Sequence, residues 1–134
     1  MATLSATKAG ITKAVHAGLN VVSVNYTVAA SLSAGDTIVC CGIPKGAVVH
    51  DVAIAGGSGA CTVDLGDSND DDRYVAAESA SVANPVVRSS TLGGLNYEYT
   101  ADDNLIITVD AVATGTATGV FKLSVAYSLD QVTA

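Results

Sequence analysis

The sequence has few aromatic residues, with no tryptophan, one phenylalanine and five tyrosines among its 134 residues. Alanine and valine dominate the apolar residues, which make up 49% of the chain. Because small side chains bury little apolar area each, the core they form is thin and suits two β-sheets packed face to face. A thin core of this kind also predicts a subunit that is stabilised further by a partner copy.

Long apolar runs are also lacking. No run approaches the roughly 20 residues that a bilayer requires, and the first eight residues have no apolar stretch typical of a secretion signal. We therefore expect a protein made in a reducing cytoplasm, with no membrane partner. The three cysteines are odd in number, and neighbours such as Cys40 and Cys41 face opposite sides of a strand. We interpret all three, including Cys61, as small apolar residues.

Basic residues are scarce, since six lysines and arginines stand against 13 acidic residues, for a net charge of −7. Residues 1–35 contain Lys8 and Lys13 and no acid, whereas residues 36–134 hold four basic residues and all 13 acids. A nucleic-acid groove needs clustered basic side chains that face phosphate. The acidic body therefore argues against nucleic acid as a partner.

The chain does contain one β-strand pattern after another from Leu19 to Asp130. In residues 120–130 apolar and polar side chains alternate, which predicts a strand with one buried face. Strands are predicted at residues 24–30, 37–41, 47–55, 61–65, 96–100, 105–110 and 120–130. Residues 77–94 are predicted to be mostly loop, with one short strand near residues 86–88. About eight strands separated by turn residues predict an all-β fold, an antiparallel, jelly-roll-like β-sandwich over residues 19–134.

Two local patterns refine this prediction. Pro44 and Gly46 are placed for a type I turn with a left-handed fourth residue. Residues 37–41 are apolar on both faces, which predicts a strand covered on both sides, one of them by a second subunit. In the following strand, Val48, His50, Val52 and Ile54 are predicted to share one face.

Residues 1–18 differ from the body because they are rich in threonine and alanine and are interrupted by Gly10 and Gly18. This composition disfavours a stable helix, and we expect an N-terminal arm that becomes ordered when it docks on another surface. Its two lysines favour an acidic surface, and its apolar anchors are too sparse to form a core. The candidate contact residues of the arm are Leu4, Lys8, Ile11, Lys13 and Val15.

A hairpin through the Pro44 turn would place Cys40 opposite His50, and a thiol beside an imidazole is one arrangement for nucleophilic catalysis. No third residue that would orient the pair is evident, so an ordinary cross-strand pair is the favoured interpretation. The sequence also lacks a phosphate-binding loop and a dinucleotide fingerprint. We expect no enzymatic activity and no cofactor.

An acidic stretch follows the strand at residues 61–65 and partly matches a calcium-binding loop. Positions 1, 3, 5 and 12 of that pattern are Asp67, Asn69, Asp71 and Glu78. Position 6 is Asp72, where the sharp turn requires glycine, and the flanking segments have strand rather than helix patterns. We therefore expect no specific metal site but a solvated turn in which Asp70 or Asp72 pairs with Arg73.

Four short motifs carry a resemblance to a known group of proteins. They are His16-Ala17-Gly18-Leu19-Asn20, Ile43-Pro44-Lys45-Gly46-Ala47, Val63-Asp64-Leu65-Gly66-Asp67 followed by Asp72-Arg73-Tyr74, and Tyr97-Glu98-Tyr99-Thr100-Ala101-Asp102-Asp103. Together they resemble small structural proteins of tailed bacteriophages, in particular capsid decoration (cement) proteins. The resemblance implies a jelly-roll-like homotrimer on the outer capsid surface of the virion, where it bridges and stabilises subunits of the major capsid protein.

The alternative is a head-fibre or tail-associated β-sandwich that binds carbohydrate or a host surface. Carbohydrate sites usually present aromatic rings on which a sugar ring stacks. Tyr97 and Tyr99, two residues apart on one predicted strand, would share a face and form the only such platform.

Overall fold

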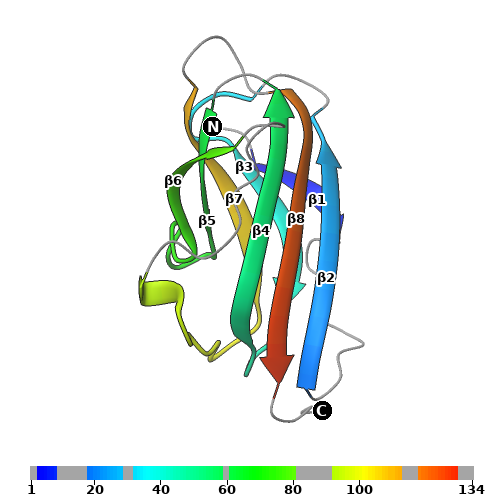
Figure 1. The fold of residues 1–134 in the computed structure, drawn as a ribbon, viewed down its shortest axis with the longest axis vertical. Helices are drawn as coiled ribbons and strands as arrows, with labels where there is room; N and C mark the ends of the chain where they lie inside the picture. Colours follow the sequence, from blue (N-terminus) through cyan, green and yellow to red (C-terminus); the bar gives the residue numbers. More distant parts are fainter. Residues whose placement is uncertain are drawn as a thin grey trace.

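The structure is a computed structural model, and it describes residues 3–8, 18–28, 32–58, 61–80, 92–112 and 118–129. Within these residues, eight strands form two sheets that lie one behind the other (Figure 1). The five-stranded sheet has the order β1 (Thr3–Lys8), β3 (Thr37–Ile43), β7 (Asp103–Val112), β5 (Cys61–Gly66), β6 (Val75–Ala80). The three-stranded sheet has the order β2 (Gly18–Thr27), β8 (Thr118–Leu129), β4 (Val48–Ser58). The prediction of an all-β sandwich with about eight strands is confirmed.

The core lies between the two sheets and follows the predicted alternation. In β8 the apolar residues at every second position are all buried, namely Phe121, Leu123, Val125, Tyr127 and Leu129. Facing strands of the five-stranded sheet contribute Ile38, Val63, Leu65, Leu105, Ile107 and Val109, each at most 1% exposed. Burial of one such side chain stabilises the fold by about 1.5–3 kcal/mol. The core therefore rests mainly on aliphatic residues, as the composition predicts.

The segment Thr3–Lys8, which the sequence places in the arm, forms β1 at the edge of the five-stranded sheet. It pairs with β3 in parallel, with Thr3 opposite Thr37. This parallel pair involves residues outside 19–134, and the other strand pairs of the described residues are antiparallel, as predicted. The segment has only one large apolar residue, Leu4, which packs partly buried against the core, and so its strand pattern is too weak to recognise. The other candidate arm positions, Ile11, Lys13 and Val15, lie outside the described residues.

Gly46 adopts the predicted left-handed conformation, but the turn spans residues 44–47, one residue later than predicted, and it connects different partners. Gly46 has a φ of +89°, and the Ala47 amide donates a hydrogen bond to the Pro44 carbonyl at 3.1 Å. The chain then crosses from one sheet to the other, since β3 pairs with β7 and β1 whereas β4 pairs with β8. The predicted hairpin, with Cys40 opposite His50, is therefore wrong.

Two β-bulges explain why buried and exposed positions do not simply alternate along β3 and β4. The register of β3 shifts between Val39 and Cys41, and both Cys40 and Cys41 are buried within this one chain. The apolar run at residues 37–41 therefore requires no second subunit. The register of β4 shifts between Val49 and Asp51, because a bulge adds one residue and changes which face the following side chains occupy.

As a result of that second bulge, the predicted common face of β4 is wrong in its first half. Val49, Val52 and Ile54 are buried, whereas His50 is exposed and Val48 is only half-buried.

The segment predicted as a strand at residues 96–100 is mostly irregular. It follows the short 3₁₀ helix η1 (Leu92–Gly94), and Asn96 has a φ of +59°. Glu98 alone forms a bridge, to Val48. Conversely, residues 77–80, predicted as loop, belong to β6. The predicted strand at residues 86–88 lies outside the described residues.

Candidate functional site

Asp67, directly after β5, lies at the centre of a cluster of buried polar and aromatic side chains. Its side chain is fully buried, and Oδ2 accepts hydrogen bonds from Arg73 Nε at 2.5 Å and from the Tyr99 hydroxyl at 2.9 Å. Its Oδ1 accepts hydrogen bonds from the backbone amides of Asn69 and Asp70 at 3.0 and 3.1 Å. The carboxylate therefore closes its own loop and joins that loop to residue 99.

Aromatic rings complete this cluster. The Arg73 guanidinium lies 3.6 Å from the centroid of the Tyr97 ring, which favours the cation. Tyr97 meets Tyr99 edge to face, with ring centroids 5.0 Å apart. The Tyr74 hydroxyl donates a hydrogen bond to the Tyr99 hydroxyl at 2.8 Å. Residues 66–74 and 97–99 are thereby held together at one end of the sandwich.

The directions of the pKa shifts agree with the hydrogen bonds of this cluster. Burial alone would raise the pKa of Asp67, but hydrogen bonds from Arg73, Tyr99 and the Asn69 amide outweigh burial and hold the pKa below its ordinary value. Burial raises the pKa of Tyr99 and of Tyr74. Asp67 therefore stays ionised and both phenols stay protonated at neutral pH, which is the state that maintains the hydrogen bonds.

The sequence identified the partner of Arg73 only in part. Asp70 Oδ2 lies 3.7 Å from Arg73 Nη1, which confirms the predicted pair, but the closer partner is Asp67. Sequence reasoning missed Asp67 because it treated this residue as the first ligand of a calcium loop. Its oxygens instead accept hydrogen bonds from within the chain.

Three other carboxylates of this loop gather at the surface. One oxygen from each of Asp70, Asp71 and Asp72 lies within 4.8 Å of the others. A hydrogen bond to Asp70, and then the neighbouring charges, raise the pKa of Asp72. Exposed acidic groups of this kind are common without an ion, and the cluster has no glycine turn to shape it.

Removal of divalent cations should leave the stability of the protein unchanged. Asp67 is held by Arg73 and Tyr99 rather than by an ion, and the remaining acids are exposed or half-exposed. The measurement is the melting temperature in EDTA and in calcium. A fall of more than a few degrees in EDTA would show that the loop holds a structural cation.

The thiol and imidazole groups do not come together. Cys40 is buried in β3, and burial raises its pKa to about 12. His50 is exposed on β4 in the other sheet, and its Nε2 lies 2.6 Å from Ser128 Oγ. All three cysteines are buried and none forms a disulfide, which confirms their interpretation as small core residues.

The outward side of the three-stranded sheet, called here the outer face, is unlike the rest of the surface. Its side chains come from Leu19, Val21, Ser23 and Asn25 in β2, Lys122, Ser124, Ala126 and Ser128 in β8, and Val48, Asp51, Ala53 and Ala55 in β4. A groove of about 280 Å³ crosses it and is lined by Ser23, Asn25, Ala53, Ala55, Lys122 and Ser124, with Ile54 and Leu123 beneath. Leu19 and Val21 are 67% and 65% exposed.

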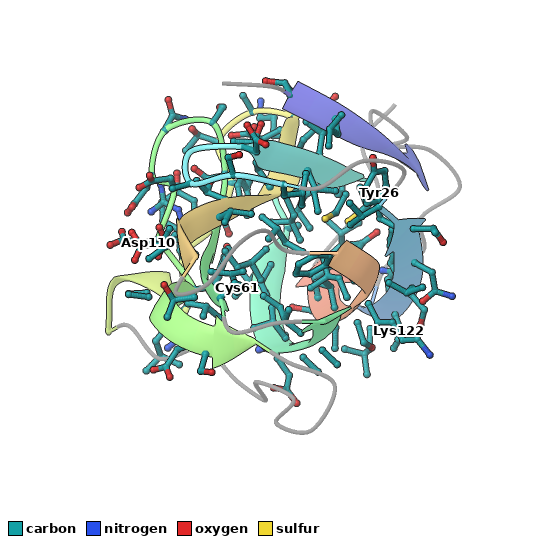
Figure 2. The ribbon with its side chains drawn as sticks, turned by 90° about the horizontal axis from the view of Figure 1, so that it is seen from above. Tyr26, Cys61, Asp110 and Lys122 are labelled. Atoms are coloured by element: carbon teal, nitrogen blue, oxygen red, sulfur yellow. The ribbon has the colours of Figure 1, made fainter. Side chains whose placement is uncertain are left out.

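Charge differs between the two sides of the sandwich. Figure 2 places Lys122 at the outside of the three-stranded sheet, Cys61 in the interior and Asp110 on the far side of the molecule. The outward side chains of β5 and β7 include Asp64 and Asp110. Burial raises the pKa of Asp64, and nearby Asp110 raises it further. Acidic residues therefore gather on the five-stranded side.

The predicted aromatic platform is not present as expected. Tyr99 is 3% exposed, and Tyr97 is half-buried with Arg73 over its ring. The two rings meet edge to face rather than side by side. No pair of tyrosines in the described residues therefore has the arrangement predicted for stacking on a sugar.

No family model matches the sequence, and no curated protein matches it. Three solved structures contain a chain of similar fold. A chain in "Capsid of Ralstonia phage GP4" is 20% identical with a TM-score of 0.74, over 98% of this chain and 99% of that one. A chain in "Cyanophage Pam1 capsid asymmetric unit" is 20% identical with a TM-score of 0.71, over 90% and 91%.

The third is a chain in "Acidic stable capsid structure of Helicobacter pylori bacteriophage KHP30", which is 15% identical with a TM-score of 0.58, over 89% of this chain and 94% of that one. At these identities the likeness establishes a shared fold, and it is the fold of chains in phage capsid structures. Among the described residues, no helix has the length and apolar character that crossing a membrane requires.

Proposed function

We propose that this protein is a structural subunit of a phage virion that binds the outer capsid surface and stabilises it by bridging subunits of the major capsid protein. The observation that carries the proposal is the fold likeness to a chain of the GP4 capsid, which covers 98% of this chain and 99% of that one. Because both chains are matched over nearly their full length, the likeness is to a small capsid chain of similar size. That size suits an added subunit.

Charge supports the outer location. The chain carries a net charge of −7, and packaged DNA repels an acidic surface. The acids on the outward side of the five-stranded sheet suit exposure to solvent. A homotrimer made in the host cytoplasm and added to the completed shell, with no nucleic acid partner and no enzymatic activity, fits this distribution.

The fibre or tail alternative has less support. Its carbohydrate-binding form depended on Tyr97 and Tyr99, and these rings instead hold Arg73 and Asp67 in place. No other observation among the described residues favours a sugar site over a protein contact.

We further propose that residues 9–17, together with Lys8 at the end of β1, contact the shell. This segment contains Lys13 and no acid, so it is attracted to an acidic surface that the body would avoid. Several such segments on one oligomer would bind at once and strengthen attachment.

The test is to mix the protein with phage heads that lack it and to measure co-sedimentation. Wild-type protein should attach, and Lys13→Glu should weaken attachment at least tenfold, since the change is repeated in each copy of the oligomer. The matched control is Lys45→Glu, an equal charge change at an exposed lysine of the body. Failure of wild-type protein to bind the heads contradicts the proposed function, whereas equal binding by the two variants contradicts only the role of the arm.

A further inference from the structure

We propose that the outer face is the surface through which copies of this chain associate, with Leu19 and Val21 of one copy packing into the groove of the next. This inference rests on the homotrimer in the proposed function and adds where its subunits meet. The occupant of the groove is therefore a second copy of the chain.

The first argument is shape. Leu19 and Val21 lie on β2, an edge strand, and 67% and 65% of their surface is exposed. Large apolar side chains exposed side by side are typical of interaction sites. The groove lies beside them on the same face and is lined mainly by short side chains. A protruding apolar pair and a hollow of small residues are complementary.

The register of the strands shows which side chains line the groove. Ser23, Ser124 and Ala53 form one row across the three strands, and Asn25, Lys122 and Ala55 form the next. Short side chains in the first row leave room above the sheet. At about 280 Å³, the groove is slightly below the range of roughly 300–1,000 Å³ typical of small-molecule sites, and its size suits side chains of a protein partner.

The second argument is charge. Two copies with a net charge of −7 each repel one another, so they associate most readily where acids are few. Among its described residues the outer face has one acid, Asp51, accompanied by His50 and Lys122. The outward side of the five-stranded sheet instead carries Asp64 and Asp110. The charge distribution therefore selects the outer face for contact between copies.

The third argument is position. Leu19 and Val21 are near the start of β2, whereas the groove begins at Ser23 and crosses to β4. One copy cannot fill its own groove with its own β2, so the edge of one subunit packs on the face of another. Contacts between two different patches generate rings when the rotation closes, which is compatible with threefold symmetry.

The test is the oligomeric state, measured by light scattering and sedimentation at micromolar concentration. The double variant Leu19→Lys/Val21→Lys should shift the protein to monomers and weaken association at least a hundredfold. The matched control is Leu95→Lys, because Leu95 is 62% exposed but lies outside the outer face. Leu95→Lys should keep the wild-type mass. Lysine is common on edge strands, and circular dichroism checks that the fold is retained.

A second variant changes the groove instead of Leu19 and Val21. Ala53→Arg places a long charged side chain in the groove and should also produce monomers. If both variants fold and keep the wild-type mass, the outer face is not the contact, although the homotrimer stands. If wild-type protein is itself monomeric, this inference and the homotrimer both fail, whereas binding to phage heads tests the capsid role separately.

Discussion

Replacing Asp67 by asparagine is expected to lower the free energy of unfolding by about 3 kcal/mol, since loss of one partner from a buried ion pair costs about 3–5 kcal/mol. The Arg73 side chain is 11% exposed and would lose its closest countercharge. The amide of asparagine would also present a donor where the carboxylate accepts from Arg73 and Tyr99. Urea unfolding gives the free energy, and the melting temperature should fall by roughly 10 °C.

The pH dependence of stability distinguishes the contribution of the Asp67–Arg73 ion pair from that of apolar packing. The folded pKa of Asp67 is lower than its ordinary value, so the unfolded chain takes up this proton more readily. The stabilisation is therefore complete above the unfolded pKa of about 3.9 and is lost as the pH falls through the folded pKa. The difference in melting temperature between wild type and Asp67→Asn should be largest at neutral pH and should shrink below about pH 4.

Asp70→Asn is the matched control for this experiment. Asp70 lies 3.7 Å from Arg73 and its side chain is 41% exposed, and exposed pairs contribute little. Its replacement should change stability far less than replacement of Asp67. Equal losses in the two variants, or a difference for Asp67 that does not vary with pH, would show that the buried ion pair is not what stabilises this end of the sandwich.

Local signals in the sequence predicted most of the strands and the left-handed conformation of Gly46. The alternation in β8 depends only on neighbouring residues, and all five of its predicted core residues are buried. The left-handed Gly46 is likewise a local consequence of the turn. The sheet that β4 joins depends on its pairing with β8, which is distant in the sequence. No residue near the turn determines that pairing. For the same reason the sequence did not predict the crossing between sheets.

The cluster around Asp67 could not be predicted from local sequence patterns, because it joins residues that are distant in the sequence. The loop after β5 was recognised as acidic, but Tyr99, which fixes the role of Asp67, follows it by 32 positions. The positions of the tyrosines did hold a clue to the cluster. The chain has only five tyrosines, and three of them lie in this cluster. The sequence also held a clue to the exposed apolar pair of the outer face. β2 has apolar residues on both of its sides, with Leu19 and Val21 on one and Val22 and Val24 on the other.

Deleting residues 2–8 is expected to destabilise the protein by about 3 kcal/mol, as several backbone hydrogen bonds contribute roughly 0.5–1.5 kcal/mol each. β1 covers the edge of β3, and Leu4 packs against the core. Its removal leaves β3 as an unprotected edge, which favours aggregation. Thermal unfolding and light scattering provide the measurement, with Leu4→Ala as a milder comparison that keeps the strand.

An unchanged melting temperature after this deletion would show that β1 adds nothing to the sheet. If the deletion does destabilise the fold, loss of attachment by a chain that lacks residues 2–18 is not evidence for contact by the arm. That truncation removes part of the five-stranded sheet together with Lys8 and Lys13. The charge change at Lys13 leaves β1 in place, and it therefore separates attachment to the shell from the stability of the sandwich.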